Sequence, residues 1–136
     1  MTKVSGIMTT SPTTIDRADP VSDAFRALSR APYHHLIVTD GGRPVGMVSS
    51  TDLLRLVHDV DGFDQESMYD YLDQQYTIDD AMTPELRTVS HTAAVRDAAV
   101  VLAEGAFHSV VVVDDYGNLA GIVTTTDLAR YVADGA

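Results

Sequence analysis

The chain has 136 residues, 45% of them hydrophobic, and a net charge of −11 from 20 acidic and 9 basic side chains. This apolar content can bury a core and argues against disorder. Cysteine is absent, which excludes disulfides, thiol nucleophiles and thiolate metal ligands. The acidic balance argues against nucleic acid as a partner, and no apolar run reaches the roughly 20 residues that span a bilayer, so no membrane partner is expected.

The location expected from these features is cytoplasmic, because the N-terminus lacks the basic and apolar regions of a secretory signal. The chain is rich in Asp and has one lysine, Lys3, a composition that resembles proteins of salt-accumulating microbes. In about 1 M salt the Debye length falls to about 3 Å, which would screen the self-repulsion of such a surface. An ordinary acidic cytosolic protein is the alternative.

The first half of the chain predicts a short extended piece, a helix, two strands and a second helix. Asp19-Pro20 opens the first helix, with Asp19 as the N-cap and Pro20 at the first helical position. Apolar residues then recur at helical spacing, from Val21 to Leu28. The other elements are an extended piece at 13–15, a strand at 36–38, a strand ending at Ser49 and a helix at about 51–58.

The second half repeats the first. Met8-Thr9 corresponds to Met82-Thr83, and GMVSSTDLLR at 46–55 corresponds to GIVTTTDLAR at 121–130. The order β-α-β-β-α therefore occurs twice, which predicts an α/β (α+β) fold of two repeats packed together, because one copy alone would expose a face of its sheet. The corresponding elements are an extended piece at 87–89, a helix opened by Thr92, a strand at 110–113, a strand ending at Thr124 and a helix at about 126–133.

A linker joins the repeats. Asp59–Asp64 has the composition of a solvated turn, and residues 65–75 predict a short helix with Met68, Tyr71 and Leu72 on one side. The predicted division is therefore a first repeat at 1–60, a linker helix at 61–79 and a second repeat at 80–136.

Three motifs, each present twice in the same order, resemble a tandem pair of cystathionine-β-synthase (CBS) domains, also called a Bateman module. They are IMTTSPTTI and AMTPELRTV, HHLIVTD and HSVVVVDD, and GMVSSTDL and GIVTTTDL, and they cover residues 4–136. The resemblance implies two repeats packed sheet to sheet about a pseudo-twofold axis. It also implies clefts that bind adenosyl ligands (AMP, ADP, ATP, S-adenosylmethionine or NAD), assembly into a homodimer, and regulation of a partner protein.

The resemblance also implies roles for particular residues. The acid of the G-x-x-S/T-x-x-D motif binds the ribose hydroxyls and its Ser or Thr lies near the ribose and phosphate; these are Asp52 with Ser49, and Asp127 with Thr124. A carboxylate suits a cis-diol because its two oxygens can accept both hydroxyl protons. The adenine-contacting positions are Thr14, Ile15, Thr88 and Val89, and the phosphate-contacting positions are His34, His35, His108 and Ser109.

Two alternatives follow from the same residues. Spacing alone predicts that Ser49 with Asp52, and Thr124 with Asp127, form helix capping boxes, a role that does not exclude ligand binding. The phosphate positions hold histidine without Lys or Arg, which disfavours ATP and leaves AMP, S-adenosylmethionine or a cation-bridged phosphate. No metal site is expected, because His34 and His35 would point to opposite faces of a strand.

No enzyme is expected, because the chain lacks a phosphate-binding G-x-x-x-x-G-K-S/T loop, a G-x-S-x-G elbow and an H-E-x-x-H pair. No catalytic residue and no resident cofactor are predicted. The predicted function is a stand-alone regulatory module that senses an adenosyl ligand and signals to an unknown regulated protein. The alternative is a structural dimerisation module whose ligand clefts are vestigial.

Overall fold

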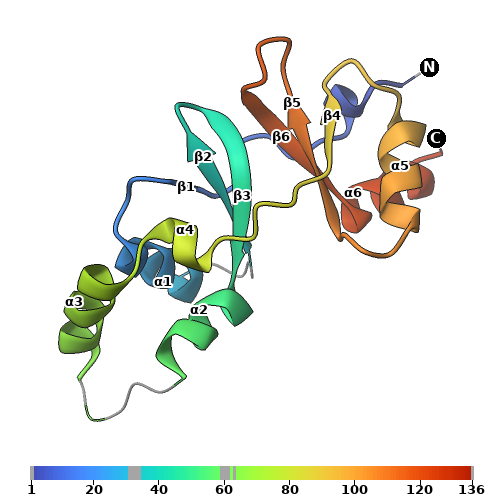
Figure 1. The fold of residues 1–136 in the computed structure, drawn as a ribbon. Helices are drawn as coiled ribbons and strands as arrows, with labels where there is room; N and C mark the ends of the chain where they lie inside the picture. The colour runs from blue at the N-terminus through green and yellow to red at the C-terminus, as the bar shows by residue number, and fades with distance from the viewer. Residues whose placement is uncertain (1, 31–34, 59–61, 63, 136) are drawn as a thin grey trace. The chain divides into compact units, whose positions relative to one another are not determined.

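The computed structural model of the chain describes residues 2–30, 35–58, 62 and 64–135. Its elements run in the order β-α-β-β-α twice, as the sequence predicts, with a short 3-10 helix before the first repeat and two helices between the repeats (Figure 1). They are η1 (Val4–Gly6), β1 (Thr14–Asp16), α1 (Val21–Arg30), β2 (His35–Asp40), β3 (Arg43–Ser49), α2 (Ser50–Val57), α3 (Gln65–Gln75), α4 (Ile78–Ala81), β4 (Thr88–Ser90), α5 (Val95–Ala103), β5 (Ser109–Val113), β6 (Leu119–Thr124) and α6 (Thr125–Ala133). No helix within the described ranges is long and apolar enough to cross a membrane.

The chain forms two compact units that exchange segments between the two halves of the sequence. Unit 1 comprises Met1–Pro12, Gly42–Pro44 and Leu86–Ala136, and unit 2 comprises Thr13–Gly41 and Val45–Glu85. The N-terminal segment thus belongs to the unit built on the second repeat, while the helices of the linker belong to the unit built on the first. The predicted division of the sequence into 1–60, 61–79 and 80–136 stays a prediction. The two compact units do not follow these boundaries.

Unit 2 is a three-stranded sheet in the order β1-β2-β3 with α1 to α4. β1 pairs with β2 in parallel, and Thr14 lies opposite Ile37. Helix α1 contacts α2, α3 and α4 (Figure 1). The buried side chains that form its core are Ile15, Val21, Ala24, Leu36, Val38, Val48, Leu53, Leu72, Ile78 and Ala81.

The linker helix α3 has the predicted bounds and the predicted buried side. Leu72 is fully buried, and Met68 and Tyr71 pack against the core of unit 2. The Ser67 amide donates a hydrogen bond to Asp64 at 2.7 Å, which caps α3 and lowers the pKa of the Asp64 carboxyl below its ordinary value.

The predicted N-cap of α1 is wrong. Asp19 accepts a hydrogen bond from the Asp16 amide at 3.0 Å, and α1 begins at Val21. The Ser22 amide instead donates to Asp73 of α3 at 2.8 Å, and the buried Ser22 hydroxyl donates to the same carboxylate at 2.6 Å. A side chain from the linker thus satisfies the start of α1, a long-range contact that local sequence does not reveal.

Unit 1 is a three-stranded sheet in the order β4-β5-β6 that packs with α5, α6 and the N-terminal segment. β5 pairs with β6 in antiparallel register, which sets Ser109 opposite Thr124. The predicted start of α5 at Thr92 is wrong: the helix begins at Val95, and Asp97 accepts from the Ala94 amide at 3.1 Å. The buried core comprises Val4, Ala98, Val101, Leu102, Val110, Val112 and Val123.

The N-terminal segment joins unit 1 by backbone pairing. The Thr9 amide donates to the Ile122 carbonyl at 2.8 Å, and the Ile122 amide donates to the Thr9 carbonyl at 3.0 Å. Gly121 makes this approach possible, because a Cβ there would lie 2.7 Å from Met8 Sδ and 2.8 Å from the Thr9 carbonyl oxygen.

Unit 2 repeats this arrangement with the segment that follows α4. Met47 and Thr83 exchange both backbone hydrogen bonds at 2.9 Å. A Cβ on Gly46 would lie 2.8 Å from the Thr83 carbonyl oxygen and would collide with the Met82 side chain. Each G-x-x-S/T-x-x-D motif therefore begins with glycine because a larger residue would clash with the Met-Thr segment that pairs with the same strand.

We expect Gly121→Ala to destabilise unit 1 by about 1–3 kcal/mol, because the added methyl overpacks the contact with Met8 and Thr9. Urea denaturation followed by circular dichroism measures this change. Gly6→Ala is the matched control, since its Cβ would meet only Thr2 Cγ2 at an ordinary 3.6 Å. Equal stability of the two variants would contradict the role assigned to Gly121.

Candidate functional site

The first candidate site lies in unit 1, where β6 ends and α6 begins. Thr124 and Asp127 form a capping box: the Thr124 amide donates to Asp127 Oδ2 at 2.9 Å, and the Asp127 amide donates to Thr124 Oγ1 at 3.2 Å. The capping role predicted from spacing is confirmed. The capping box holds the Asp127 carboxylate at the start of α6, and the bonds from Thr124 are made to Oδ2.

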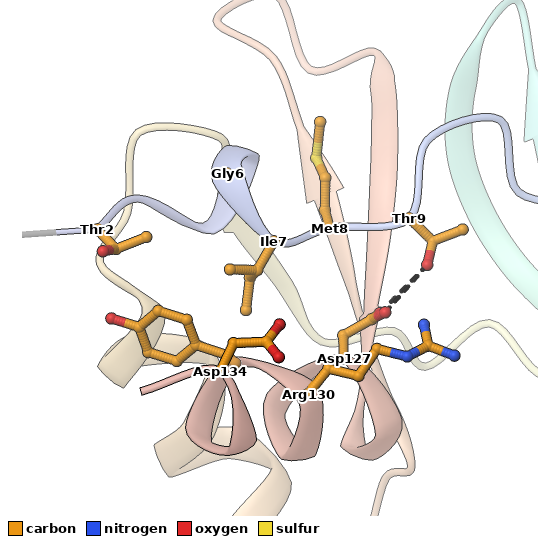
Figure 2. A pocket seen from close by; sticks show the side chains of 9 residues that line it. Thr2, Gly6, Ile7, Met8, Thr9, Asp127, Arg130 and Asp134 are labelled. Carbon is orange, nitrogen blue, oxygen red and sulfur yellow. Dashed lines mark hydrogen bonds between the residues drawn. The ribbon is translucent and has the colours of Figure 1, made fainter. Parts of the chain in front are cut away.

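Thr9 brings the N-terminal segment to the same carboxylate. Its hydroxyl lies 3.2 Å from Asp127 Oδ1 and 3.3 Å from Oδ2 and donates to this carboxylate (Figure 2). Asp127 is only 7% exposed. The backbone pairing of Thr9 with Ile122 holds the hydroxyl in reach, so the contact depends on the fold of unit 1 and not on the motif alone.

A pocket of about 440 Å³ lies between the N-terminal segment and α6 within unit 1 (Figure 2). Asp127 and Arg130 stand toward the Thr9 end, and Asp134 stands toward Thr2 (Figure 2). The lining residues are Thr2, Gly6, Ile7, Met8, Thr9, Asp127, Arg130, Tyr131 and Asp134.

The second candidate site is the counterpart in unit 2, where β3 ends and α2 begins. Ser49 and Asp52 form the same capping box, with bonds of 2.8 Å from the Ser49 amide to Asp52 Oδ2 and 3.1 Å from the Asp52 amide to Ser49 Oγ. Arg55 Nη1 lies 3.4 Å from Asp52 Oδ1. The Thr83 hydroxyl, which corresponds to that of Thr9, makes no hydrogen bond to Asp52, so the two sites differ.

The remaining predicted residues of unit 1 lie on two neighbouring strands and the residue before one of them. Thr88 and Val89 are in β4, which pairs with β5 in parallel. Ser109 opens β5 beside Thr124, and His108 lies exposed just before it. The structure thus brings Ser109 to the start of α6, while an adenine-contacting role for Thr88 and Val89 stays a prediction.

The predicted residues of unit 2 show the same arrangement. Thr14 and Ile15 are in β1, and His35 opens β2. Ile15 is 5% exposed and its side chain belongs to the core of unit 2, whereas Thr14 is exposed. His34 lies outside the described residues. Adenine and phosphate contacts for these positions stay predictions.

Sequence reasoning did not select Thr9, Arg130, Tyr131 or Asp134 as site residues. Thr9 could have been found from the sequence, because the Met-Thr pair occurs near the start of each repeat, as Met8-Thr9 and as Met82-Thr83. Arg130 and Asp134 follow Asp127 at one and two helical turns, and this spacing could have placed them on the same face of α6.

The arrangement is suited to binding a polyhydroxyl group. A carboxylate held by a capping box at a helix N-terminus is oriented before any ligand arrives, and its oxygens retain lone pairs for further donors. Among residues 2–30, 35–58, 62 and 64–135, no three His, Asp or Glu side chains gather in the way that a metal ion would need.

Residues 4–59 and 78–134 match the family model described as the CBS domain, in two tandem positions. The chain therefore belongs to the CBS domain family and carries a tandem pair of these domains, which confirms the resemblance seen in the motifs.

Solved structures of CBS pairs share this fold. CBSX2 from Arabidopsis thaliana in complex with AMP is 28% identical with a TM-score of 0.77, and the match covers 98% of each chain. The CBS domain pair of protein MJ0100, solved with 5′-methylthioadenosine and S-adenosyl-L-methionine, is 25% identical with a TM-score of 0.74 and covers 100% of this chain and 99% of that chain.

The curated relatives are longer proteins. Protein MJ1404 of Methanocaldococcus jannaschii is 35% identical over 140 residues, which cover 98% of this chain and 32% of that protein. The L-aspartate semialdehyde sulfurtransferase of the same organism is 27% identical over 131 residues, covering 96% of this chain and 23% of the enzyme. The chain spans less than half the length of these two relatives.

We expect Thr9→Val to destabilise unit 1 by about 1–3 kcal/mol, because Asp127 loses a hydrogen-bond donor while it remains buried. Thr83→Val is the matched control at the corresponding position of unit 2, where the hydroxyl does not reach Asp52. Chemical denaturation of both variants measures the difference, and an equal loss at the two positions would show that the Thr9–Asp127 contact adds nothing.

Proposed function

We propose that this chain is a regulatory CBS pair that binds an adenosyl ligand through Asp52 and Asp127. The observation that carries the proposal is the duplicated carboxylate, held in each repeat by a capping box at the start of a helix, with Asp127 facing a pocket of about 440 Å³. The ligands of CBSX2 and MJ0100 (AMP, 5′-methylthioadenosine and S-adenosyl-L-methionine) share an adenosyl group, which supports this ligand class.

In this proposal the ribose 2′- and 3′-hydroxyls donate to the carboxylate. Oδ1 of Asp127 is the natural acceptor, because Oδ2 already accepts from the Thr124 amide and hydroxyl. The Thr9 hydroxyl can turn from Asp127 toward the ligand without moving the backbone, which its two bonds to Ile122 hold. Thr9, Asp127 and Thr124 would then surround one edge of the ribose.

Ligand binding would act as a signal by shifting populations. A ligand that contacts both the N-terminal segment and α6 stabilises the conformation in which the two are docked, to the extent that it binds this conformation better than others. The proposed output is a change in contact with a regulated protein in the cytoplasm, made by a homodimer of this chain. Catalysis is not part of the proposal, and the sulfurtransferase activity of a relative of which this chain spans 23% is not carried over.

The second candidate function is a structural dimerisation module with vestigial ligand sites. The contact between Thr9 and Asp127 favours it, because this bond satisfies the carboxylate without any ligand. Thermal unfolding with AMP, ATP, S-adenosylmethionine and NAD separates the two functions. A ligand at about 100 times its Kd adds about 2.7 kcal/mol to the stability, so the regulatory module should show a clear rise in Tm with one of them, and the scaffold none.

We expect Asp127→Asn and Asp52→Asn each to weaken adenosyl binding about tenfold or more, because an amide replaces one charged acceptor by a donor. The rise in Tm on adding ligand, measured from each variant's own ligand-free Tm, separates binding from stability. Asp97→Asn is the matched control: the Asp97 carboxylate accepts from the Ala94 amide at the start of α5 in unit 1 but does not line the pocket.

The control variant should keep the full rise in Tm, measured from its own ligand-free Tm. If Asp127→Asn and Asp52→Asn also keep it, the two acids are helix caps alone and the proposed ligand contacts are wrong.

A further inference from the structure

Arg130 is the only lysine or arginine among the residues that line the pocket of unit 1. It follows Asp127 by three residues on α6, so the two side chains are neighbours on the same helical face. Figure 2 shows the Arg130 guanidinium at the Thr9 and Asp127 end of the pocket, away from Thr2.

Within the described part of the chain, the Arg130 side chain makes no ion pair or hydrogen bond. Arg130 nonetheless lines the same pocket as Asp127 and Asp134. The arginines that do form ion pairs are Arg17 with Asp40 and Asp79, Arg26 with Asp23, Arg55 with Asp52, and Arg87 with Glu104.

The internal repeat provides a direct comparison. Arg55 occupies the corresponding position in unit 2, and there its guanidinium lies 3.4 Å from the Asp52 carboxylate. In unit 1 the Thr9 hydroxyl takes that place on Asp127, and the guanidinium of Arg130 is left unpaired. The same sequence motif thus presents a paired arginine in one unit and an available one in the other.

We propose that Arg130 selects an adenosyl ligand with an anionic 5′ group, a nucleoside 5′-monophosphate, at the Asp127 site. This inference rests on the proposed function and assigns the ligand class of that same site. A 5′-phosphate lies across the ribose ring from the 2′- and 3′-hydroxyls, so a nucleotide held by Asp127 needs its cation at a distance from the carboxylate. An arginine one helical turn further along α6 meets this need, and its planar fork matches two phosphate oxygens.

The other charges of the pocket agree with a single phosphate. Asp134 also lines it, and Figure 2 shows Asp134 on the side of Asp127 that faces away from Thr9. A longer polyphosphate would carry several negative charges into a pocket with two carboxylates and one guanidinium. S-adenosylmethionine would place its sulfonium cation next to the 5′ carbon, where the guanidinium repels it. Arg130 therefore supplies the basic contact that the histidine positions of the sequence lack.

Calorimetric titration of the full chain with AMP, adenosine and S-adenosylmethionine tests this assignment. The wild type should bind AMP about tenfold or more tighter than adenosine, the size expected of a charge-assisted contact. Arg130→Gln should remove this preference while adenosine affinity stays within about twofold, and Arg130→Lys should keep part of it. Raising the salt concentration should weaken AMP binding and leave adenosine binding nearly unchanged.

Arg96→Gln is the matched control, because Arg96 is exposed on α5 in the same unit and does not line the pocket. It removes the same charge and should leave the preference for AMP intact. Repeating the titrations in an Asp52→Asn background assigns the effect to the Asp127 site.

Three outcomes would overturn the inference while leaving adenosyl binding in place: equal affinity for AMP and adenosine, tighter binding of S-adenosylmethionine than of AMP, or an unchanged preference in Arg130→Gln. If none of the three compounds binds the wild type, the proposed function itself is wrong and the inference fails with it.

Discussion

The docking of each Met-Thr segment on a glycine of the last strand is the constraint on which the rest of this structure depends. Thr9 pairs with Ile122 over Gly121, and Thr83 pairs with Met47 beside Gly46. A side chain on either glycine would meet a backbone carbonyl oxygen at 2.8 Å, so no rotamer change can relieve the clash. Each compact unit is therefore completed by a segment that lies far away in the sequence.

The docking of the Met-Thr segments also accounts for a difference between Asp127 and Asp52. The backbone pairing brings the Thr9 hydroxyl to Asp127, whereas the equivalent pairing leaves the Thr83 hydroxyl away from Asp52. Asp52 instead has a partner on its own helix, Arg55, at a distance of 3.4 Å. An exposed pair of that kind is weak and screened by salt. Two sites with the same motif thus present different sets of available donors and acceptors.

Much of the fold could be predicted from the sequence because each repeat has sequence patterns that depend only on residues close together in the chain. Helical spacing of apolar residues, turn residues and the capping boxes at Ser49 and Thr124 all act within a few residues, and they gave the β-α-β-β-α order and the bounds of α3. Long-range contacts could not be predicted in this way. The start of α1 is satisfied by Asp73 of α3, and the Thr9–Asp127 contact joins residues from opposite ends of the chain.

The capping role and the proposed ligand role of Asp127 support each other physically. The helix start fixes the carboxylate through Oδ2, so a ligand would not have to order a flexible side chain in order to bind it, and less conformational entropy would be lost. The cap also explains why an acid stands at this position in both units, even though the residues around it differ. What distinguishes the units is the second partner of each carboxylate, which is Thr9 for Asp127 and Arg55 for Asp52.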